Sequence, residues 1–198
     1  WRSLADEGVV ELLGGPATHP VLPLVREPVA HLALSTGLDD HVRRLGHRPA
    51  GIWLPECAYE PGVEHLLAAH DVGALALWDL SHSAGAIPVD LNGSGADLAV
   101  GCGYKYLNGG PGTPAFIYAA KHHQDRIRQP LSGWMGHAAP FAFDRQYRAA
   151  QGMRQFLAGT PPILSMGLLD AALDVFEGVD MQVLRDKSRQ LGELFLER

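Results

Sequence analysis

Ala74-Leu-Ala-Leu-Trp-Asp79, Asp97-Leu-Ala-Val-Gly101 and Ala115-Phe-Ile-Tyr118 are three short apolar runs separated by glycine-containing loops. The first two runs have the length and composition of buried strands, and the third also predicts a strand. Amphipathic patterns follow over residues 163–176 and 181–196. Strands that alternate with helices predict an α/β domain, in which helices cover a mainly parallel sheet.

Further local structure is expected between and after these strands. Residues 83–87 are short enough for a single helical turn, which Pro88 would end. The pattern in 181–196 assigns five apolar side chains to the core: Val183, Leu184, Leu191, Leu194 and Phe195.

The first 70 residues are richer in proline, histidine and arginine and are less periodic. Asp39 and Asp40 followed by Arg43 and Arg44 predict a helix from about residue 36 that Gly46 ends, since these charges complement the helix dipole. We expect a short strand over 51–55 and a second helix over 61–70.

Composition excludes several classes of protein. The chain has 198 residues, a net charge of −6 and 46% hydrophobic residues, which is typical of a globular protein. No basic stripe or bilayer-length apolar run is present, so neither nucleic acid nor a membrane is an expected partner. Cys57 and Cys102 lack metal-type spacing and predict reduced thiols in a cytoplasmic protein. His122 and His123 lie in a polar run and are expected to be solvated, and no metal site is predicted.

Asp79 and Lys105 are the residues that point to chemistry. Each follows a predicted strand, and ligands of open α/β sheets bind at the carboxyl ends of strands. Pyridoxal 5'-phosphate requires a lysine that forms an imine and an acid that keeps the ring nitrogen protonated. The pair therefore predicts a site for this cofactor, although each residue alone is more often structural.

Four separated motifs resemble kynureninase, a fold-type I pyridoxal-phosphate enzyme related to class V aminotransferases. They are Leu77-Trp-Asp-Leu-Ser-His-Ser-Ala-Gly-Ala-Ile-Pro-Val-Asp90, Gly103-Tyr-Lys-Tyr-Leu-Asn-Gly-Gly-Pro-Gly-Thr-Pro-Ala-Phe116, Gly133-Trp-Met-Gly-His137 and Gly159-Thr-Pro-Pro-Ile-Leu164. They occur in family order, from about residue 74 to the end. The resemblance implies the large domain of a fold-type I enzyme, incomplete at both ends.

The resemblance also implies roles for particular residues. Lys105 would form the imine, Asp79 would pair with the ring nitrogen, and His82 would lie beside the ring. Tyr104 would bind the phosphate, and Trp134 and Thr160 would reach it across a homodimer interface. These roles are the catalytic and cofactor-binding set that we expect for this chain.

The family reaction cleaves L-kynurenine or its 3-hydroxy form to an anthranilate and L-alanine, in tryptophan catabolism and NAD biosynthesis. The family places a stacking aromatic residue and phosphate-loop residues upstream of Asp79, where this chain has different sequence. Its substrate-binding arginine lies in a C-terminal small domain that would follow Arg198. We therefore expect cofactor binding but weak turnover.

The first half contains a different set of motifs. Gly51-Ile-Trp-Leu-Pro-Glu-Cys-Ala-Tyr59 and Glu11-Leu-Leu-Gly-Gly-Pro-Ala-Thr-His-Pro-Val-Leu-Pro23 resemble glycoside hydrolase family 57, in particular its glucan branching enzymes. The resemblance implies a small α/β fragment of a glycosidase barrel, with Glu56 as nucleophile and His19 in the substrate cleft. A retaining glycosidase needs a second carboxylate about 5 Å from the first, and no matching aspartate follows.

The chain is therefore expected to be a composite of residues 1–70, which resemble the glycosidase family, and 71–198, which resemble kynureninase. Three functional hypotheses follow. The protein is a kynureninase-like hydrolase that binds pyridoxal phosphate, a glucan-acting fragment that uses Glu56, or a catalytically inert fusion.

Overall fold

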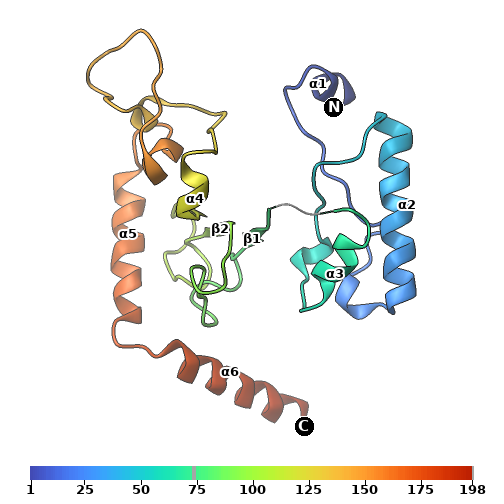
Figure 1. Ribbon diagram of the computed structural model, residues 1–198. Helices are drawn as coiled ribbons and strands as arrows, with labels where there is room; N and C mark the ends of the chain where they lie inside the picture. Colours follow the sequence, from blue (N-terminus) through green and yellow to red (C-terminus); the bar gives the residue numbers. More distant parts are fainter. Residues whose placement is uncertain (73–74, 198) are drawn as a thin grey trace. The chain divides into compact units, whose positions relative to one another are not determined.

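Contacts along the chain divide it into two units, Trp1–Leu75 and Ala76–Arg198, in the computed structural model (Figure 1). The structure describes residues 1–72 and 75–197, without the side chain of Cys57. Ala74, the first residue of the predicted run 74–79, therefore lies outside the described part. Each unit is treated by itself below.

Helix α2 (Glu27–Leu45) dominates the first unit. It begins nine residues before the predicted start at 36, because Pro28 occupies the first turn, where its missing N–H costs nothing. The predicted end is confirmed: Gly46 adopts a left-handed conformation (φ 85°) and its N–H donates to the Val42 carbonyl. The core of this unit is formed by Ala30 and Leu34 of this helix together with Leu22 and Val63.

The other elements of the first unit are short. They are α1 (Arg2–Asp6), η1 (Leu22–Leu24), η2 (Pro55–Cys57) and α3 (Val63–Ala68), and α3 lies inside the predicted helix 61–70. The predicted strand over 51–55 is wrong. Only Ile52 forms a parallel bridge, to Gly14, and Pro55 then begins η2. Proline has no N–H to donate to a strand ladder, so pairing stops there.

A close backbone approach holds residues 14–19 against α2. A Cβ on Gly37 would lie 2.0 Å from the Gly15 carbonyl oxygen, so only glycine permits this contact. The Ala17 N–H donates to the Ala33 carbonyl at 2.8 Å. The segment that carries His19 is therefore fixed directly on the helix.

The second unit contains a three-stranded sheet in the order β1–β2–β3. Its strands are β1 (Leu77–Asp79), β2 (Leu98–Cys102) and β3 (Ala115–Ala119). β1 pairs with β2 in parallel and β2 with β3 antiparallel, so the sheet is mixed. The expectation that β1 is buried is wrong: Leu77 is 58% exposed, because β1 is an edge strand of this sheet.

The helices of the second unit follow the sheet in sequence. They are α4 (Lys121–Gln124), η3 (Trp134–Gly136), η4 (Gly152–Phe156), α5 (Ile163–Leu173), η5 (Asp174–Phe176) and α6 (Met181–Leu196). The bounds of α6 agree with the prediction, and Asp180 caps it by accepting from the Gln182 N–H. Residues 83–87 form turns rather than the predicted helix.

The core assignment in α6 is wrong for this structure. Leu184 is half-buried, while Val183, Leu191, Leu194 and Phe195 are between 50% and 81% exposed. The pattern predicted correctly that these residues share a face, but a helical period cannot say what covers that face.

Candidate functional site

Asp79 and Lys105 lie at the same edge of the sheet. Asp79 is the last residue of β1 and aligns with Val100 of the parallel strand β2. The Leu80 N–H continues the pairing by donating to the Val100 carbonyl at 2.7 Å. Lys105 follows three residues after β2 ends at Cys102. Parallel pairing therefore brings both loops to one end of the strands, as the sequence predicted.

The two loops are in direct contact. Gly85 has a φ of 84°, and a Cβ there would lie 2.5 Å from the Tyr106 carbonyl oxygen. The Cys102 thiol lies 3.8 Å from the Ser81 carbonyl oxygen, which accepts its hydrogen bond. The turn after β1 is thus packed on the loop that carries Lys105.

Hydrogen bonds from Ser81 dominate the environment of Asp79. The Ser81 N–H donates to Asp79 Oδ1 at 2.8 Å. Bonds from the Ser81 side chain and backbone lower the pKa of Asp79, and the charges of Lys105 and His82 lower it further. The carboxylate is therefore ionised at neutral pH, and its exposure to water also favours the charged form. An ionised acid is the partner that a protonated pyridine nitrogen would need.

Lys105 is half-buried, and its Nζ lies 5.4 Å from the centroid of the Tyr104 ring. A turn closes behind it, in which the Asn108 N–H donates to the Lys105 carbonyl at 2.9 Å. Leu169 of α5 packs beneath the same loop, where a Cβ on Gly103 would lie 3.1 Å from its methyl groups. Helix α5 thus packs against the loop on either side of the lysine, at Gly103 and Gly109.

His82 is exposed and faces the edge of the Tyr106 ring, with 6.5 Å between ring centroids. The structure therefore brings Asp79, His82, Tyr104 and Lys105 to one edge of the sheet. Tyr106 is an addition that the sequence did not single out. The sequence feature that could have identified it is its position directly after Lys105, which Tyr104 and Tyr106 flank.

Trp134 and Thr160 form a second group in the same unit. Their segments meet where the Met135 N–H donates to the Ala158 carbonyl at 3.1 Å. Both residues are exposed, and Trp134 makes an edge-to-face contact with Phe141 at 5.6 Å. Their assignment to the phosphate remains a prediction.

His19 and Glu56 of the first unit are also brought together. His19 Nε2 lies 3.3 Å from Glu56 Oε1, although 37 residues separate them. Both adopt a φ of 56°, which is strained for residues other than glycine. Such strain is frequent at functional sites. The contact agrees with the expectation that both residues belong to one site. The roles of Glu56 as nucleophile and of His19 in the substrate cleft remain predictions.

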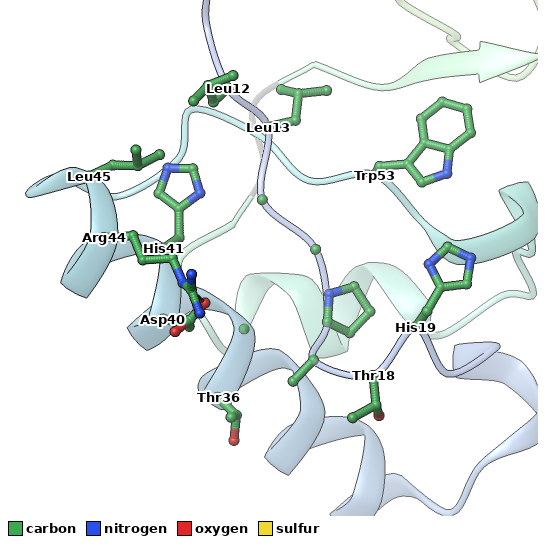
Figure 2. A pocket seen from close by; sticks show the side chains of 15 residues that line it. Leu12, Leu13, Thr18, His19, Thr36, Asp40, His41, Arg44, Leu45 and Trp53 are labelled. Atoms are coloured by element: carbon green, nitrogen blue, oxygen red, sulfur yellow. Dashed lines mark hydrogen bonds and ion pairs between the residues drawn. The ribbon is translucent and has the colours of Figure 1, made fainter. Parts of the chain in front are cut away.

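A cavity of about 800 Å³ opens beside His19 (Figure 2). Trp53 and Thr18 lie near His19, while His41 and Arg44 project from α2. His41 is buried, and its Nε2 has no hydrogen-bond partner among the described residues. Burial, and secondarily the charge of His47, lowers the pKa of His41. Sequence reasoning missed Trp53 and His41, although Trp53 stands inside the motif around Glu56.

No helix in the described part of the chain is both long and apolar enough to cross a membrane.

Cys102, the last residue of β2, is a free thiol, as the sequence predicted.

Comparison with known proteins identifies relatives of both halves. Residues 60–198 match the family model of aminotransferase class-V, and residues 1–113 match that of glycosyl hydrolase family 57. Kynureninase of Deinococcus radiodurans is 59% identical over 129 residues, which cover 65% of this chain and 32% of that protein. Kynureninase of Burkholderia mallei is 57% identical over 124 residues, which cover 63% and 30%. The chain thus spans about a third of the length of these curated relatives.

A solved structure supports the fold. Cysteine desulfurase of Escherichia coli covers 70% of this chain and 34% of its own, with a TM-score of 0.52 at 22% identity. The matches confirm both resemblances and a partial fold-type I α/β domain, whose family depends on pyridoxal 5'-phosphate. The chain belongs to the aminotransferase class-V family over residues 60–198 and to glycosyl hydrolase family 57 over residues 1–113.

Proposed function

We propose that the sheet edge carrying Asp79 and Lys105 binds pyridoxal 5'-phosphate and acts as a kynureninase-type hydrolase. The substrate would be L-kynurenine or 3-hydroxykynurenine, cleaved to an anthranilate and L-alanine. The observation that carries the proposal is the parallel pairing of β1 and β2, which places an ionised carboxylate and a half-buried lysine at one end of the sheet. The two kynureninase relatives support the choice of substrate.

Each residue has a separate task in this proposal. When bound, the cofactor would withdraw electrons from the substrate carbon next to its amine. Lys105 Nζ would hold the cofactor covalently and, once released, move protons at that carbon. The Asp79 carboxylate would keep the ring nitrogen protonated, and His82 would lie against the ring. Tyr104, Trp134 and Thr160 would donate hydrogen bonds to the phosphate.

Cofactor binding is tested by titrating the protein with pyridoxal phosphate and recording its visible absorbance. Lys105→Ala should abolish the bound spectrum. Lys187→Ala on the exposed face of α6 is the matched control and should leave it unchanged. Borohydride reduction fixes the cofactor on its lysine, and peptide mapping then identifies which of the chain's three lysines carries it. Identical spectra for the wild type and Lys105→Ala would leave only the inert-fusion hypothesis for this unit.

Turnover is a separate question, measured by the fluorescence of released anthranilate. We expect very weak turnover, because the sequence before residue 60 matches the glycosidase family instead of continuing the aminotransferase match. The stacking and phosphate-loop residues of the cofactor family would have to come from there. Rates like those of full-length kynureninases would contradict this expectation.

Trp134 and Thr160 would bind the cofactor phosphate of a partner subunit. We infer a cytoplasmic homodimer in which these exposed residues complete the phosphate site of the other chain. If so, an equimolar mixture of Lys105→Ala and Trp134→Ala chains should bind more cofactor than the average of the two variants measured alone. Binding equal to the average of the two variants would argue against shared sites.

A second candidate function rests on the contact between His19 and Glu56 and on the adjacent cavity. The first unit would bind a glucan and use Glu56 as nucleophile. Hydrolysis requires a second carboxylate, so we expect binding of maltooligosaccharides without cleavage. Comparison of the wild type with Glu56→Gln by calorimetry and product analysis tests both parts.

We also propose that the chain joins a glycosidase fragment to a kynureninase fragment near residues 66–73, within codons 60–80. Sequencing the locus across these codons tests this origin. An intact upstream kynureninase half in the same reading frame would exclude it.

A further inference from the structure

A second group of titratable side chains lies at the opposite end of β2 from Lys105. Asp97 directly precedes β2, and α4 follows the antiparallel strand β3. The register pairs Leu98 with Ala119, and the Ala120 N–H donates to the Asp97 carbonyl at 2.9 Å. Sheet pairing therefore fixes Asp97 beside the start of α4, away from the proposed cofactor site.

Two adjacent imidazoles of α4 converge on this carboxylate. His123 Nε2 lies 2.6 Å from Asp97 Oδ1, and His122 Nε2 lies 3.7 Å from the same oxygen. The ring centroids are 4.0 Å apart. One ligand-type atom from each of the three residues lies within 4.8 Å of the others. Two imidazole nitrogens and a carboxylate oxygen thus share a small volume.

The cluster is partly preorganised. The His123 side chain is 7% exposed, and that of Asp97 is 24% exposed. Asp97 Oδ2 accepts from the Ala76 N–H at 3.3 Å, which orients Oδ1 towards the histidines. The expectation that both histidines are solvated is therefore wrong for His123. His122 remains 66% exposed and is free to adjust.

We propose that Asp97, His122 and His123 bind a divalent transition-metal ion of the zinc type. Ligand atoms of a tetrahedral zinc site lie about 3.3 Å apart, since each is about 2.0–2.2 Å from the ion. The contact between Asp97 and His122 is close to this value, and that between Asp97 and His123 must lengthen by about 0.7 Å when an ion enters. Imidazole donors favour zinc, cobalt or nickel over magnesium, which prefers oxygen ligands. Three protein ligands leave a fourth position for water.

A hydrogen-bonded pair of Asp97 with His123 alone is the simpler explanation of these contacts. The two explanations differ at His122, which is not needed for a hydrogen bond between Asp97 and His123 but supplies the third ligand of a metal site. His122 also tolerates replacement, because its side chain is largely exposed. The decisive variant is therefore His122→Ala.

The experiment titrates the metal-free full-length chain with zinc chloride by calorimetry, with no pyridoxal phosphate present. We expect one zinc per chain at this site and a loss of affinity of at least about tenfold in His122→Ala, since even changes around a metal site cost ~10–100-fold. His65→Ala, an exposed histidine of α3, is the matched control and should bind like the wild type. Circular dichroism confirms that each variant folds.

Cobalt(II) supplies a second measurement, through the intense visible absorption of four-coordinate cobalt. The wild type and His65→Ala should develop this absorption, and His122→Ala should not. The proposal is overturned if the wild type binds no zinc, or if His122→Ala binds zinc as tightly as the wild type. Magnesium chloride should produce no competing binding, and effective competition by magnesium would also overturn it.

Discussion

At the scale of single residues, Asp79 shows how local bonds prepare a group for chemistry. The Ser81 N–H and hydroxyl lower its pKa more than the nearby cations do. The acid is therefore charged even without Lys105. This matters because a carboxylate that protonated near neutral pH could not hold a pyridine nitrogen in its cationic form.

Asp79→Asn should weaken pyridoxal phosphate binding. Loss of a charge-assisted hydrogen bond costs about 1.5–3 kcal/mol, or roughly 10- to 100-fold in affinity. The dissociation constant from a visible-absorbance titration measures this effect. Asp170→Asn on the exposed face of α5 is the control, and equal weakening by both variants would contradict the assigned role.

The same substitution should alter the dependence of stability on pH. The pKa of Asp79 is lowered by folding from about 3.8, so its contribution is complete above that value and is lost as pH falls through the folded pKa. Urea denaturation should therefore show Asp79→Asn less stable than the wild type at pH 7, by no more than about 1 kcal/mol for an exposed group. The difference should shrink as pH falls below about 3.8. A difference that stays constant as pH falls would assign the effect to something other than charge.

At the scale of elements, replacing two glycines of the second unit with alanine should change its stability in opposite directions. Gly85 has a positive φ and touches the Tyr106 backbone, so Gly85→Ala should separate the two site loops and destabilise the unit by about 1–3 kcal/mol. Gly167 lies inside α5 with nothing within 4 Å of a Cβ, so Gly167→Ala should stabilise by about 0.5–1 kcal/mol. Denaturant unfolding measures both, and the same sign for the two variants would contradict the packing described.

Elements also show where sequence patterns succeed. Strands β2 and β3 and helix α6 agree with their predictions, because periodicity and capping are local properties. The start of α2 was missed because Asp39 and Asp40 resemble the acidic first turn of a helix, whereas Pro28 marks the actual first turn. Residues 83–87 form turns because Gly85 adopts a left-handed conformation that interrupts a helix.

At the scale of the whole molecule, the apolar faces of α5 and α6 predict self-association. Leu164 is 88% exposed and Phe195 is 81% exposed. Apolar surface of this kind typically marks an interface. We expect the chain to sediment as a dimer at micromolar concentration.

The double variant Leu191→Glu and Phe195→Glu should shift the protein towards monomer, because the two residues share one face of α6. The variant Gln182→Glu and Gln190→Glu introduces the same charge at exposed polar positions of α6 away from this face and should remain dimeric. Sedimentation velocity distinguishes the species. A monomeric wild type, or equal dissociation of both variants, would contradict the prediction.

The sequence by itself determined the α/β class, the two families and the candidate roles of Lys105, Asp79 and Glu56, because motifs and short-range periodicity are properties of neighbouring residues. The tertiary structure decided which distant residues meet. His19 reaches Glu56 because Gly37 lets residues 14–19 lie against α2. Asp97 reaches His123 because Leu98 pairs with Ala119, a register that depends on contacts between strands and that no local pattern encodes.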